Sequence, residues 1–480
     1  MSDTSSILPT AAIILAAGKS TRMKSKTPKP LHKVCGVAMS EHILRACREA
    51  HVERLVVVVG HEADKVQEGL KADDVEFSLQ AVPRGTGDAV RSAENALKDW
   101  QGTSLILAGD VPLLPAQPLK DLIVHHQATN AAATLLTMEV PNASQYGYGR
   151  IVRDENGYFK KIVEQKDATP EELLLTECNP SIYAFQGAAL WRSLEGIQPA
   201  NAQGEYYFTD TLQILNQAGD KIEILTGVNP EDVTGVNSRV ELAEVSAILR
   251  RRILHKLMVS GVTIVAPNNT YIEAGVQIGQ DTTIHPNTYL YGNTIIGEDC
   301  EIGPMTRIEN STLGNGVKVF ASQIVESVLE EEVKVGPFAN LRPKTYLEAR
   351  VKIGDFVETK NARFGVKAQA SHLSYIGDAT VGAGTNLGAG TITCNYDGFD
   401  KHHTHIGENC FIGTHSTLVA PLHIGDEAMT AAGSVITEEI HSGALALARS
   451  RQTAKEGWAK ERRTKKIAEK EAKKQSESKE

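Results

Sequence analysis

The stretch IEAGVQIGQDTTIHPNTYLYGNTIIGEDCEIGPMTRI, residues 272–308, places an aliphatic residue at every sixth position. A period of six fits neither an amphipathic helix nor an alternating strand, but it is typical of hexapeptide repeats that wind a parallel β-helix. Three hexads make one triangular turn, with the aliphatic side chain inward and a small residue at the corner. Because the register returns further along, we predict a C-terminal left-handed β-helix. Its aliphatic positions are Ile272, Ile278, Ile284, Leu290, Ile296, Ile302, Ile308, Val335, Leu341, Leu347, Ile353, Ile406, Ile412, Leu418 and Ile424.

The part of the chain before these repeats, residues 11–236, alternates short apolar runs with helix-like stretches. This order predicts a parallel, doubly wound α/β sheet of the Rossmann-like kind. Ligands of such sheets bind beyond the carboxyl ends of the strands, so the loops after Leu15 and Leu107 are the expected site. The strand-like runs are 12–16, 55–59, 104–107 and 132–138, and the helix-like stretches are 40–50 and 86–97.

Residues 238–260 lie between the two patterns and predict one long helix. Val245 and Leu249 recur at helical spacing, and Ser238 with Glu241 three residues later forms a capping-box signature. The helix is interpreted as a rigid connector, with packing inside one domain as the alternative. The expected domains are 1–237 for the α/β domain, 238–260 for the helical linker, 261–452 for the β-helix and 453–480 for a Lys- and Glu-rich tail, either a solvated helix or a disordered end.

The composition excludes several classes of protein. The chain has 480 residues, too many for one core, and its 41% apolar and 23% charged residues are ordinary for a globular protein. A net charge of −9 gives no basic field for nucleic acid. Six scattered cysteines without a CxxC pair fit a reducing compartment, the first residues lack signal-peptide features, and the aliphatic run 55–59 is too short to span a bilayer. We therefore expect a cytoplasmic protein without nucleic-acid binding or membrane insertion.

The first predicted strand leads into LAAGKSTRM (15–23) and PKPLH (28–32). Small residues let the backbone approach a phosphate chain, and Arg22 and Lys29 supply cations for a triphosphate. The P-loop pattern GxxxxGK[ST] is absent. Asp110 follows a predicted strand at the expected ligand-binding edge, where its carboxylate could hold a divalent cation. A turn or helix-capping aspartate is the alternative interpretation of Asp110.

These phrases resemble the signature of the sugar nucleotidyltransferases, as do LQAVPRGTGDAV (79–90) and LAGDVPLL (107–114). YGYGRIV (146–152), IVEQKDA (162–168), GEYYFTD (204–210) and GVNSR (235–239) narrow the resemblance to the bifunctional UDP-N-acetylglucosamine pyrophosphorylase/glucosamine-1-phosphate N-acetyltransferases, over residues 11–458. The resemblance implies that UTP and Mg²⁺ are bound here. It assigns Leu15, Ala16, Ala17, Gly18, Arg22 and Lys29 to the phosphates, Gln80, Gly85 and Thr86 to uracil, Ala108, Gly109 and Asp110 to the substrate-binding strand end, Asp110 and Asn237 to Mg²⁺, and Gly149, Glu164 and Asn179 to the amino-sugar.

His372, in QASHLSYIGDA, is the candidate base of the β-helix. Acetyl transfer to an amine needs a group that removes the ammonium proton, although a lone histidine is more often structural. SHLSYIGD and NLGAGTITCNYDG (386–398) resemble the acetyltransferase half of the same family, which makes His372 the general base. The resemblance assigns Arg342, Lys360, Tyr375 and Asn386 to the sugar phosphate, and Ala389, Asn395, Tyr396, Thr414, Ala432 and Arg449 to acetyl-CoA. Trp458 matches a C-terminal aromatic that reaches towards the acetyl-CoA site.

The chain departs from the family pattern at a few positions. These are Ser20 in place of Gly, Asp88 where some members have His, Pro180 and Ser181 after Asn179 in place of a small pair ending in Gly, Ser371 in place of Gly, and Thr414 in place of Ser. Histidines 402, 403, 405, 415 and 423 raise a zinc site of the carbonic-anhydrase type as a hypothesis. Three of them crowd the loop 393–405, so we favour a polar surface excursion.

The resemblance implies a two-step synthesis. Glucosamine 1-phosphate accepts acetyl from acetyl-CoA, and N-acetylglucosamine 1-phosphate then attacks UTP to give UDP-N-acetylglucosamine and pyrophosphate. The resemblance implies that the UDP-N-acetylglucosamine is used in peptidoglycan and lipopolysaccharide biosynthesis. It also implies a homotrimer. Two alternatives remain: a pyrophosphorylase whose β-helix only regulates or oligomerises, and a β-helix scaffold without enzymatic activity.

Overall fold

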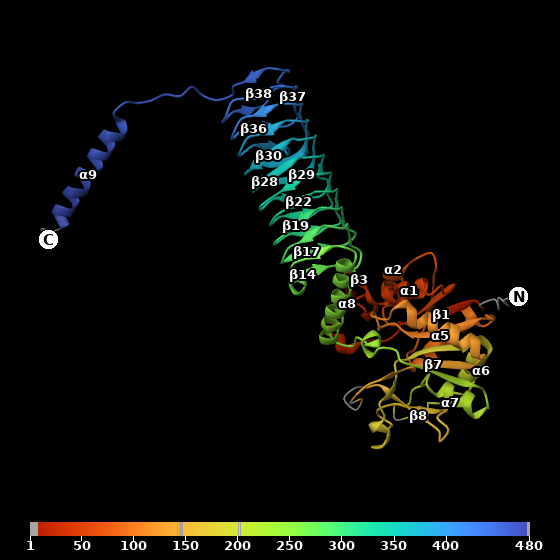
Figure 1. Ribbon diagram of the computed structural model, residues 1–480. Coiled ribbons are helices and arrows are strands. Elements are labelled where there is room, and N and C mark those ends of the chain that lie inside the picture. Colours follow the sequence, from red (N-terminus) through yellow and green to blue (C-terminus); the bar gives the residue numbers. More distant parts are fainter. Residues whose placement is uncertain (1–7, 142, 144–146, 200, 202, 478–480) are drawn as a thin grey trace. The chain divides into compact units, whose positions relative to one another are not determined.

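The computed structural model describes residues 8–141, 143, 147–199, 201 and 203–477 (Figure 1). The chain divides into two compact units, Met1–Ile295 and Ile296–Glu480.

The first unit opens with an α/β fold whose sheet has the strand order β5-β4-β1-β6-β11-β7-β10-β8-β9, with β12 beside β7. Its strands are β1 Thr10–Leu15, β4 Arg54–Val59, β5 Val75–Leu79, β6 Thr103–Ala108, β7 Ala133–Glu139, β8 Gly149–Arg153, β9 Phe159–Val163, β10 Glu177–Asn179, β11 Ile182–Gln186 and β12 Ile222–Thr226, with a small hairpin of β2 Lys33–Val34 and β3 Val37–Ala38. Its helices are α1 Met39–Glu49, α2 Ala63–Leu70, α3 Thr86–Arg91, α4 Glu94–Leu97, α5 Ala116–Thr129, α6 Gly187–Gly196 and α7 Asp210–Gln217, with short 3-10 turns η1 Thr21–Met23, η2 Lys29–Leu31, η4 Glu172–Leu174 and η5 Pro230–Val233.

The sheet is mixed rather than wholly parallel. β5, β4, β1 and β6 run parallel, as the apolar runs predict. β11 lies antiparallel between β6 and β7. β10 and β11 both run antiparallel to β7 and are separated only by Pro180 and Ser181, so they are one returning segment with a break. The direction of a buried strand is not encoded in its apolar run, which is why the sequence did not predict this.

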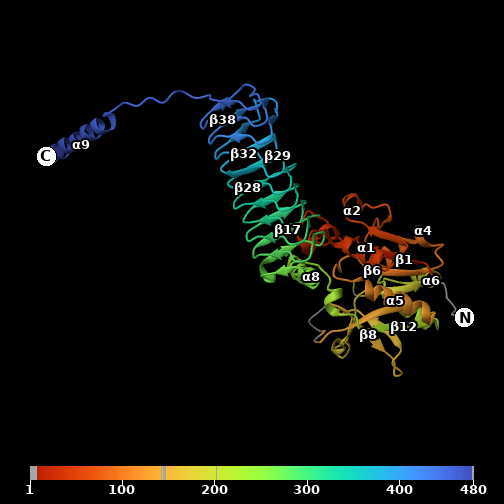
Figure 2. The same ribbon diagram turned by 45° about the horizontal axis from the view of Figure 1, so that its top comes forward.

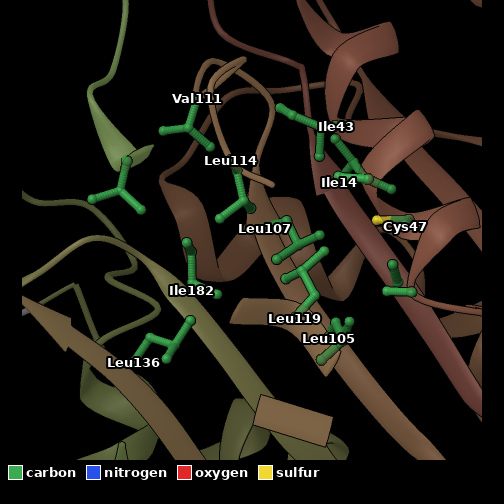
Figure 3. Packing of buried hydrophobic residues seen from close by; sticks show 14 of the residues in the cluster. Ile14, Ile43, Cys47, Leu105, Leu107, Val111, Leu114, Leu119, Leu136 and Ile182 are labelled. Atoms are coloured by element: carbon green, nitrogen blue, oxygen red, sulfur yellow. The ribbon is translucent and has the colours of Figure 1, made fainter. Parts of the chain in front are cut away.

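Two apolar layers cover the two faces of the sheet, as a doubly wound fold requires. Alternate residues of β1 serve the two layers, with Ile14 facing α1 and α5 and Ile13 facing α3, α6 and α7. Figure 3 shows the first layer, in which Ile14, Leu107 and Ile43 pack together. Each fully buried aliphatic side chain contributes about 1.5–3 kcal/mol. The packed sheet therefore holds the loops at its carboxyl edge in fixed positions.

The predicted connector helix is α8, Arg239–Val259. The capping box is confirmed, because the Ser238 hydroxyl accepts from the Glu241 N–H and the Glu241 carboxylate accepts from the Ser238 N–H at 2.7 Å. Val245 is buried against Met23 and neighbouring apolar residues of the α/β fold. The N-terminal half of α8 therefore packs against the α/β fold, as the alternative interpretation held. Towards its C-terminal end, Leu254 is buried.

The hexapeptide region forms three ladders of parallel strands, which Figure 2 shows stacked along the coil. One ladder is an 11-stranded sheet, and a 17-stranded sheet contains the other two, in which β14 pairs with β17 and β15 with β18. The aliphatic hexad positions are buried, except that Ile278 is half-buried. This arrangement is consistent with the predicted left-handed β-helix.

The 11 strands are β13 Thr263–Ile264, β16 Thr283–Ile284, β19 Glu301–Ile302, β22 Lys318–Val319, β25 Lys334–Val335, β28 Lys352–Asp355, β30 Gln369–His372, β32 Asn386–Leu387, β35 Phe411–Ile412, β38 Met429–Thr430 and β40 Leu445–Ala446. The 17 strands are β14 Thr270–Ile272, β15 Gln277–Ile278, β17 Thr288–Tyr291, β18 Ile295–Ile296, β20 Arg307–Glu309, β21 Thr312–Leu313, β23 Gln323–Val325, β24 Val328–Leu329, β26 Asn340–Leu341, β27 Tyr346–Leu347, β29 Glu358–Phe364, β31 Tyr375–Val381, β33 Ile392–Cys394, β34 Thr404–Ile406, β36 Thr417–Val419, β37 Leu422–Ile424 and β39 Val435–Ile436, and the short turn η6 Pro267–Asn269 precedes them.

The predicted interruption of the repeats lies between β33 and β34, where Tyr396 and Lys401 form an isolated antiparallel bridge. In the charged tail, α9 spans Trp458–Glu477, so the helical interpretation of this segment holds. Within the described ranges, no helix has the length and apolar character needed to cross a membrane. Residues 1–7, which carried much of the signal-peptide argument, lie outside those ranges.

Candidate active sites

A cavity of about 490 Å³ opens at the carboxyl edge of the α/β sheet, where β1 and β6 end side by side. The Gly109 N–H donates to the Leu15 carbonyl at 2.9 Å, which ties the two predicted loops together. The structure thus brings most of the predicted nucleotide-site residues to one place. Those that line the cavity are Leu15, Ala16, Ala17, Gly18, Lys29, Gln80, Gly85, Thr86, Ala108, Gly109, Asp110 and Glu164. Arg22, Gly149, Asn179 and Asn237 are not among its lining residues.

The charged end of the cavity centres on the Lys29 ammonium. Its Nζ bonds to the Asp110 carboxylate and donates to Asn237 Oδ1 at 2.9 Å. Arg22 donates to the same Asn237 oxygen at 2.9 Å. A carboxylate oxygen and an amide oxygen from segments far apart in sequence therefore converge on one cation. Hard oxygen donors of this kind suit Mg²⁺.

Gly85 and Thr86 form a loop that is tied to the GEYYFTD segment. A Cβ on Gly85, whose φ is +118°, would lie 2.5 Å from the Tyr206 carbonyl oxygen, so only glycine fits here. The Gly87 N–H donates to that carbonyl at 2.8 Å, and the Thr86 hydroxyl accepts from the Phe208 N–H at 3.0 Å. The Thr86 side chain thus has a structural partner inside the protein.

Glu164 follows β9 on the other side of the cavity. Burial raises the pKa of the Glu164 carboxyl, and the Thr209 hydroxyl, which donates to it at 3.3 Å, lowers it in part. Gly149 lies beside Glu164, since a Cβ added to it would be 3.6 Å from the Glu164 carboxylate. Asn179 is buried and donates to the Tyr183 hydroxyl at 2.7 Å. Asn179 therefore holds Tyr183, which itself lines the cavity.

Two departures from the family pattern fall on left-handed backbone. Ser20 has φ +50° and Ser181 has φ +63°, and the family's glycine at each position adopts such angles without strain. Both serines line the cavity. A non-glycine residue in this region costs of order 1–3 kcal/mol unless its surroundings hold it. At Ser181 the Asn179 side chain supplies part of that hold, because its Oδ1 accepts from the Ser181 N–H at 3.0 Å.

Sequence reasoning did not assign several lining residues, although the quoted GEYYFTD phrase contains four of them: Glu205, Tyr207, Phe208 and Thr209. It also missed Arg150, which is fully buried and donates to the Ala143 carbonyl at 2.6 Å. Arg150 stands in the quoted YGYGRIV phrase, so its position was visible but its burial was not. Tyr146 of the same phrase lies outside the described residues.

In the β-helix, one corner of successive turns carries a column of predicted residues. Backbone hydrogen bonds join them turn by turn: Gly390 N–H to His372, His415 N–H to Ala389, and Gly433 N–H to Thr414. Ala432 therefore continues the line that His372 begins. Arg449 lies next to this line, with its Cδ 3.9 Å from the position of a Cβ on Gly433. A column with one member per turn, about 4.8 Å apart, suits an extended ligand.

His372 has a partner that the sequence did not reveal. Its Nδ1 lies 2.9 Å from Asp355 Oδ1, and the two residues are paired in register on β30 and β28. A carboxylate accepts the Nδ1 proton, which leaves Nε2 as the ring atom with a free lone pair. Asp355 is seventeen residues before His372, one turn of the coil, so only the repeat register brings them together.

Cations gather where the sugar phosphate is expected. Arg342 donates to Glu358 at 2.8 Å and lies near Lys360. The pKa of Lys360 is lowered chiefly by the neighbouring Lys401, and next by Arg342. Lys401 comes from the interrupting loop and was not predicted. Tyr375 is on β31, in the same sheet as Lys360, whereas Asn386 is on β32 of the 11-stranded sheet. The predicted sugar residues thus flank the His372 corner from two sheets.

Asp378 anchors the interrupting loop. Asn361 donates to it at 2.6 Å, and the buried Asn395 amide bonds to its other oxygen. Burial raises the pKa of Asp378, but these two amides, with Lys401 and Lys360, lower it further, so its net pKa lies below the usual range. Asn395 is therefore held inside the protein, whereas Tyr396 is exposed. The loop is thus anchored at Asn395 and exposed over residues 396–401, which agrees with a polar surface excursion.

The histidines that raised a zinc hypothesis are spread over several partners. His405 and His423 stack at 5.1 Å on neighbouring strands, His402 bonds to Asp397 at 2.7 Å, and His403 to Thr380 at 2.9 Å. Across the residues that the structure covers, no group of three or more His, Cys, Asp or Glu side chains is arranged to hold a metal ion. Trp458 is exposed, with the Arg462 guanidinium over its ring.

Comparison with known proteins agrees with this architecture. A family model described as MobA-like NTP transferase domain matches residues 12–193, and one described as bacterial transferase hexapeptide (six repeats) matches residues 275–310 and 403–438. The chain is 48% identical over 447 residues to the bifunctional protein GlmU of Alkaliphilus metalliredigens, covering 93% of this chain and 97% of that protein. The corresponding proteins of Clostridioides difficile and Pelotomaculum thermopropionicum are 48% and 49% identical, over 95% of this chain and 98% and 99% of theirs.

The chain belongs to the GlmU family. Its two kinds of domain match a nucleotidyltransferase and a hexapeptide transferase, and the chain spans nearly the full length of its GlmU relatives. The predicted fold class is confirmed. So is the predicted bifunctional enzyme that makes UDP-N-acetylglucosamine by acetyl transfer followed by uridylyl transfer.

Proposed function

We propose that the two reactions of this GlmU-family enzyme occur at the two sites described above. Acetyl-CoA and glucosamine 1-phosphate react at the His372 corner, and N-acetylglucosamine 1-phosphate and UTP react in the α/β cavity. The observation that carries this proposal is the His372 column, because it joins the candidate base to Ala389, Thr414 and Ala432 along one line. Corner residues stack in this way in any parallel β-helix, but one that only regulates or oligomerises has no need of a histidine held by a carboxylate there, as His372 is by Asp355.

At the β-helix site, His372 removes a proton from the amine. Its Nδ1 hydrogen bond to Asp355 leaves Nε2 as the acceptor. The amine nitrogen of glucosamine 1-phosphate attacks the thioester carbonyl and the carbon–sulfur bond breaks. The coenzyme A thiolate takes up the proton that His372 removed and leaves as the thiol. Arg342, Lys360 and Lys401 hold the sugar phosphate, since several cations suit a phosphate monoester.

At the α/β site, the phosphate oxygen of N-acetylglucosamine 1-phosphate attacks the α-phosphorus of UTP and pyrophosphate leaves. Lys29 stabilises the charge that develops on the phosphate oxygens. Asp110 and Asn237 fit Mg²⁺, because their oxygens already converge on one cation. Mg²⁺ supplies charge neutralisation between the phosphates when it is bound. Glu164 and Gly149 hold the amino-sugar, and Asn179 positions Tyr183.

Two variants test this assignment together. Asp110→Ala should lose uridylyl transfer by at least about 10²-fold, and His372→Ala should lose acetyl transfer by roughly 10²–10⁴-fold, while each keeps the other activity. A mixture of both variants with glucosamine 1-phosphate, acetyl-CoA, UTP and Mg²⁺ should make UDP-N-acetylglucosamine after a lag, measured by mass spectrometry. A mixture that accumulates N-acetylglucosamine 1-phosphate without converting it contradicts the assignment to two separable sites.

We also propose that the enzyme is a homotrimer. Near His372, the same corner carries large apolar side chains in left-handed backbone: Met305, Phe338 and Phe356 on earlier turns and Leu373 directly after His372, each more than half exposed. Phe338 and Phe356 stack at 5.4 Å. Exposed apolar patches usually mark interfaces. A second copy of the chain packed on this ridge would bury it beside the His372 site.

We propose catalytic domains at 1–237 and 261–452, a linker at 238–260 and a tail at 453–480. α8 supports the linker, since it begins directly after Ser238. We place the enzyme in the cytoplasm, where UTP and acetyl-CoA are both at hand. Its six free cysteines agree with a reducing compartment.

A further inference from the structure

The side-chain amide of Gln80 has a fixed orientation. Gln80 follows β5, lines the nucleotide cavity and is only 6% exposed. Its Nε2 lies 2.9 Å from Asp88 Oδ2 and 3.2 Å from the Gly85 carbonyl oxygen. Both neighbours are oxygens that accept hydrogen bonds, so the atom facing them is the amide nitrogen, and it uses both of its hydrogens.

The other end of the amide, Oε1, remains available. No group in the described part of the chain donates a hydrogen bond to it, and it is not among the sealed side-chain atoms without a partner. An acceptor that belongs to a cavity-lining side chain and is not sealed in the protein is presented to the cavity. The site therefore offers a ligand a hydrogen-bond acceptor at this position and no donor.

We infer that Asp88 is a positioning residue that locks the Gln80 amide with its oxygen towards the base, so that the site selects pyrimidines with a ring N–H. This inference rests on the proposed function, which places the base at Gln80. Uracil carries a hydrogen on N3 and donates to Oε1. Cytosine carries a lone pair on N3, which would face the lone pairs of Oε1 and leave both unpaired.

Asp88 and the Gly85 carbonyl together make the lock one-sided, and the Asp88 carboxylate is the nearer of the two acceptors, at 2.9 Å against 3.2 Å. The terminal torsion of glutamine is broad and nearly two-fold, so an amide is free to turn over when its neighbour can either donate or accept. Asp88 as a carboxylate only accepts, and the Gly85 carbonyl is held in place by the tie between the loop and Tyr206. Asparagine at position 88 could donate to the oxygen of a reversed Gln80, whose nitrogen would then face the base. Only the longer contact to the Gly85 carbonyl, at 3.2 Å, would oppose this reversal. This position is one where the chain departs from some family members, which have histidine.

The test compares UTP with CTP in the full-length enzyme. Initial rates of pyrophosphate release with N-acetylglucosamine 1-phosphate and Mg²⁺ give kcat/KM for each nucleotide in wild type, Asp88→Asn, Gln80→Ala and Glu94→Gln. Because the UTP:CTP ratio is taken on one enzyme sample, it does not depend on the folded fraction. We expect Asp88→Asn to lower the ratio by about tenfold, mainly by improving CTP. Glu94→Gln, which removes an exposed carboxylate from α4, should leave it unchanged.

A second probe separates orientation from general loosening. 5-methyl-UTP has the same N3–H as UTP, so its ratio to UTP should stay the same in Asp88→Asn. A fall in that ratio together with the UTP:CTP ratio overturns the inference. An unchanged UTP:CTP ratio in Asp88→Asn, with a lowered ratio in Gln80→Ala, overturns the role of Asp88 alone. An unchanged ratio in Gln80→Ala overturns the placement of the base in the proposed function.

Discussion

Replacing Asp355 by asparagine tests how much the hydrogen bond to His372 contributes to acetyl transfer. Asparagine keeps an oxygen that accepts from His372 Nδ1 but removes the charge, and alanine removes both. The two side chains are 58% and 41% exposed, so their interaction belongs with exposed ion pairs, which are worth about 0–1 kcal/mol. We therefore expect Asp355→Asn to lose about 2-fold in kcat/KM and Asp355→Ala about 3- to 5-fold.

The assay is thiol release from acetyl-CoA with glucosamine 1-phosphate, with uridylyl transfer measured on the same samples to verify folding. Asp299→Asn, an exposed carboxylate at another corner of the coil, is the matched control and should be silent. His372→Ala sets the scale at roughly 10²–10⁴-fold. If Asp355→Ala falls as far as His372→Ala, Asp355 has a role beyond orientation. If it loses nothing, the hydrogen bond does not orient the base, and our reasoning is refuted.

Three further predictions follow from the structure. EDTA should abolish uridylyl transfer and spare acetyl transfer, and acetylation that stops with EDTA and recovers with Mg²⁺ would argue against separate sites. Phe338→Glu should convert the trimer to monomers, and Lys344→Glu at another corner should not, as measured by light scattering. A Phe338→Glu variant that stays trimeric would contradict the ridge interface. Burial, and secondarily the neighbouring His125, lowers the pKa of His126 to about 4. As the pH falls, the imidazole therefore takes up a proton in the unfolded chain before it does so in the folded protein. The free energy of unfolding should fall between pH of about 6.5 and 4, by about 3 kcal/mol at most. Urea unfolding followed by Trp100 and Trp191 fluorescence should show this slope in wild type and a flatter one in His126→Gln, and equal slopes would contradict it.

The elements that follow from local pattern were predictable. The hexad spacing gave the three ladders, and the Ser238–Glu241 pair gave the start of α8, because both depend on residues close together in sequence. The strand-end loops with Gly18 and Asp110 were also found, since the carboxyl edge of parallel strands is where ligands bind.

The features that depend on long-range register were not predictable. Asp355 meets His372 only because one turn of the coil separates them, and Lys401 reaches Lys360 only because the interrupting loop folds back. The direction of β11 was missed for the same kind of reason, since it is set by the return of the chain before β10. The family resemblance assigns Gln80, but its hydrogen bond to Asp88 depends on how the loop between the two residues folds.

The number of turns in the coil sets the length of the column that starts at His372. Each member belongs to a different turn, so the spacing from His372 through Ala389 and Thr414 to Ala432 is three steps of about 4.8 Å, or about 14 Å along the axis. The length of an extended ligand that fits this column depends on the number of turns it crosses, not on the shape of a single pocket. Inserting one whole turn between Thr414 and Ala432, which lie on adjacent turns, would preserve the packing of the coil. Under the proposed placement of acetyl-CoA along this column, the insertion would nevertheless lengthen the ligand that fits by one turn, about 4.8 Å.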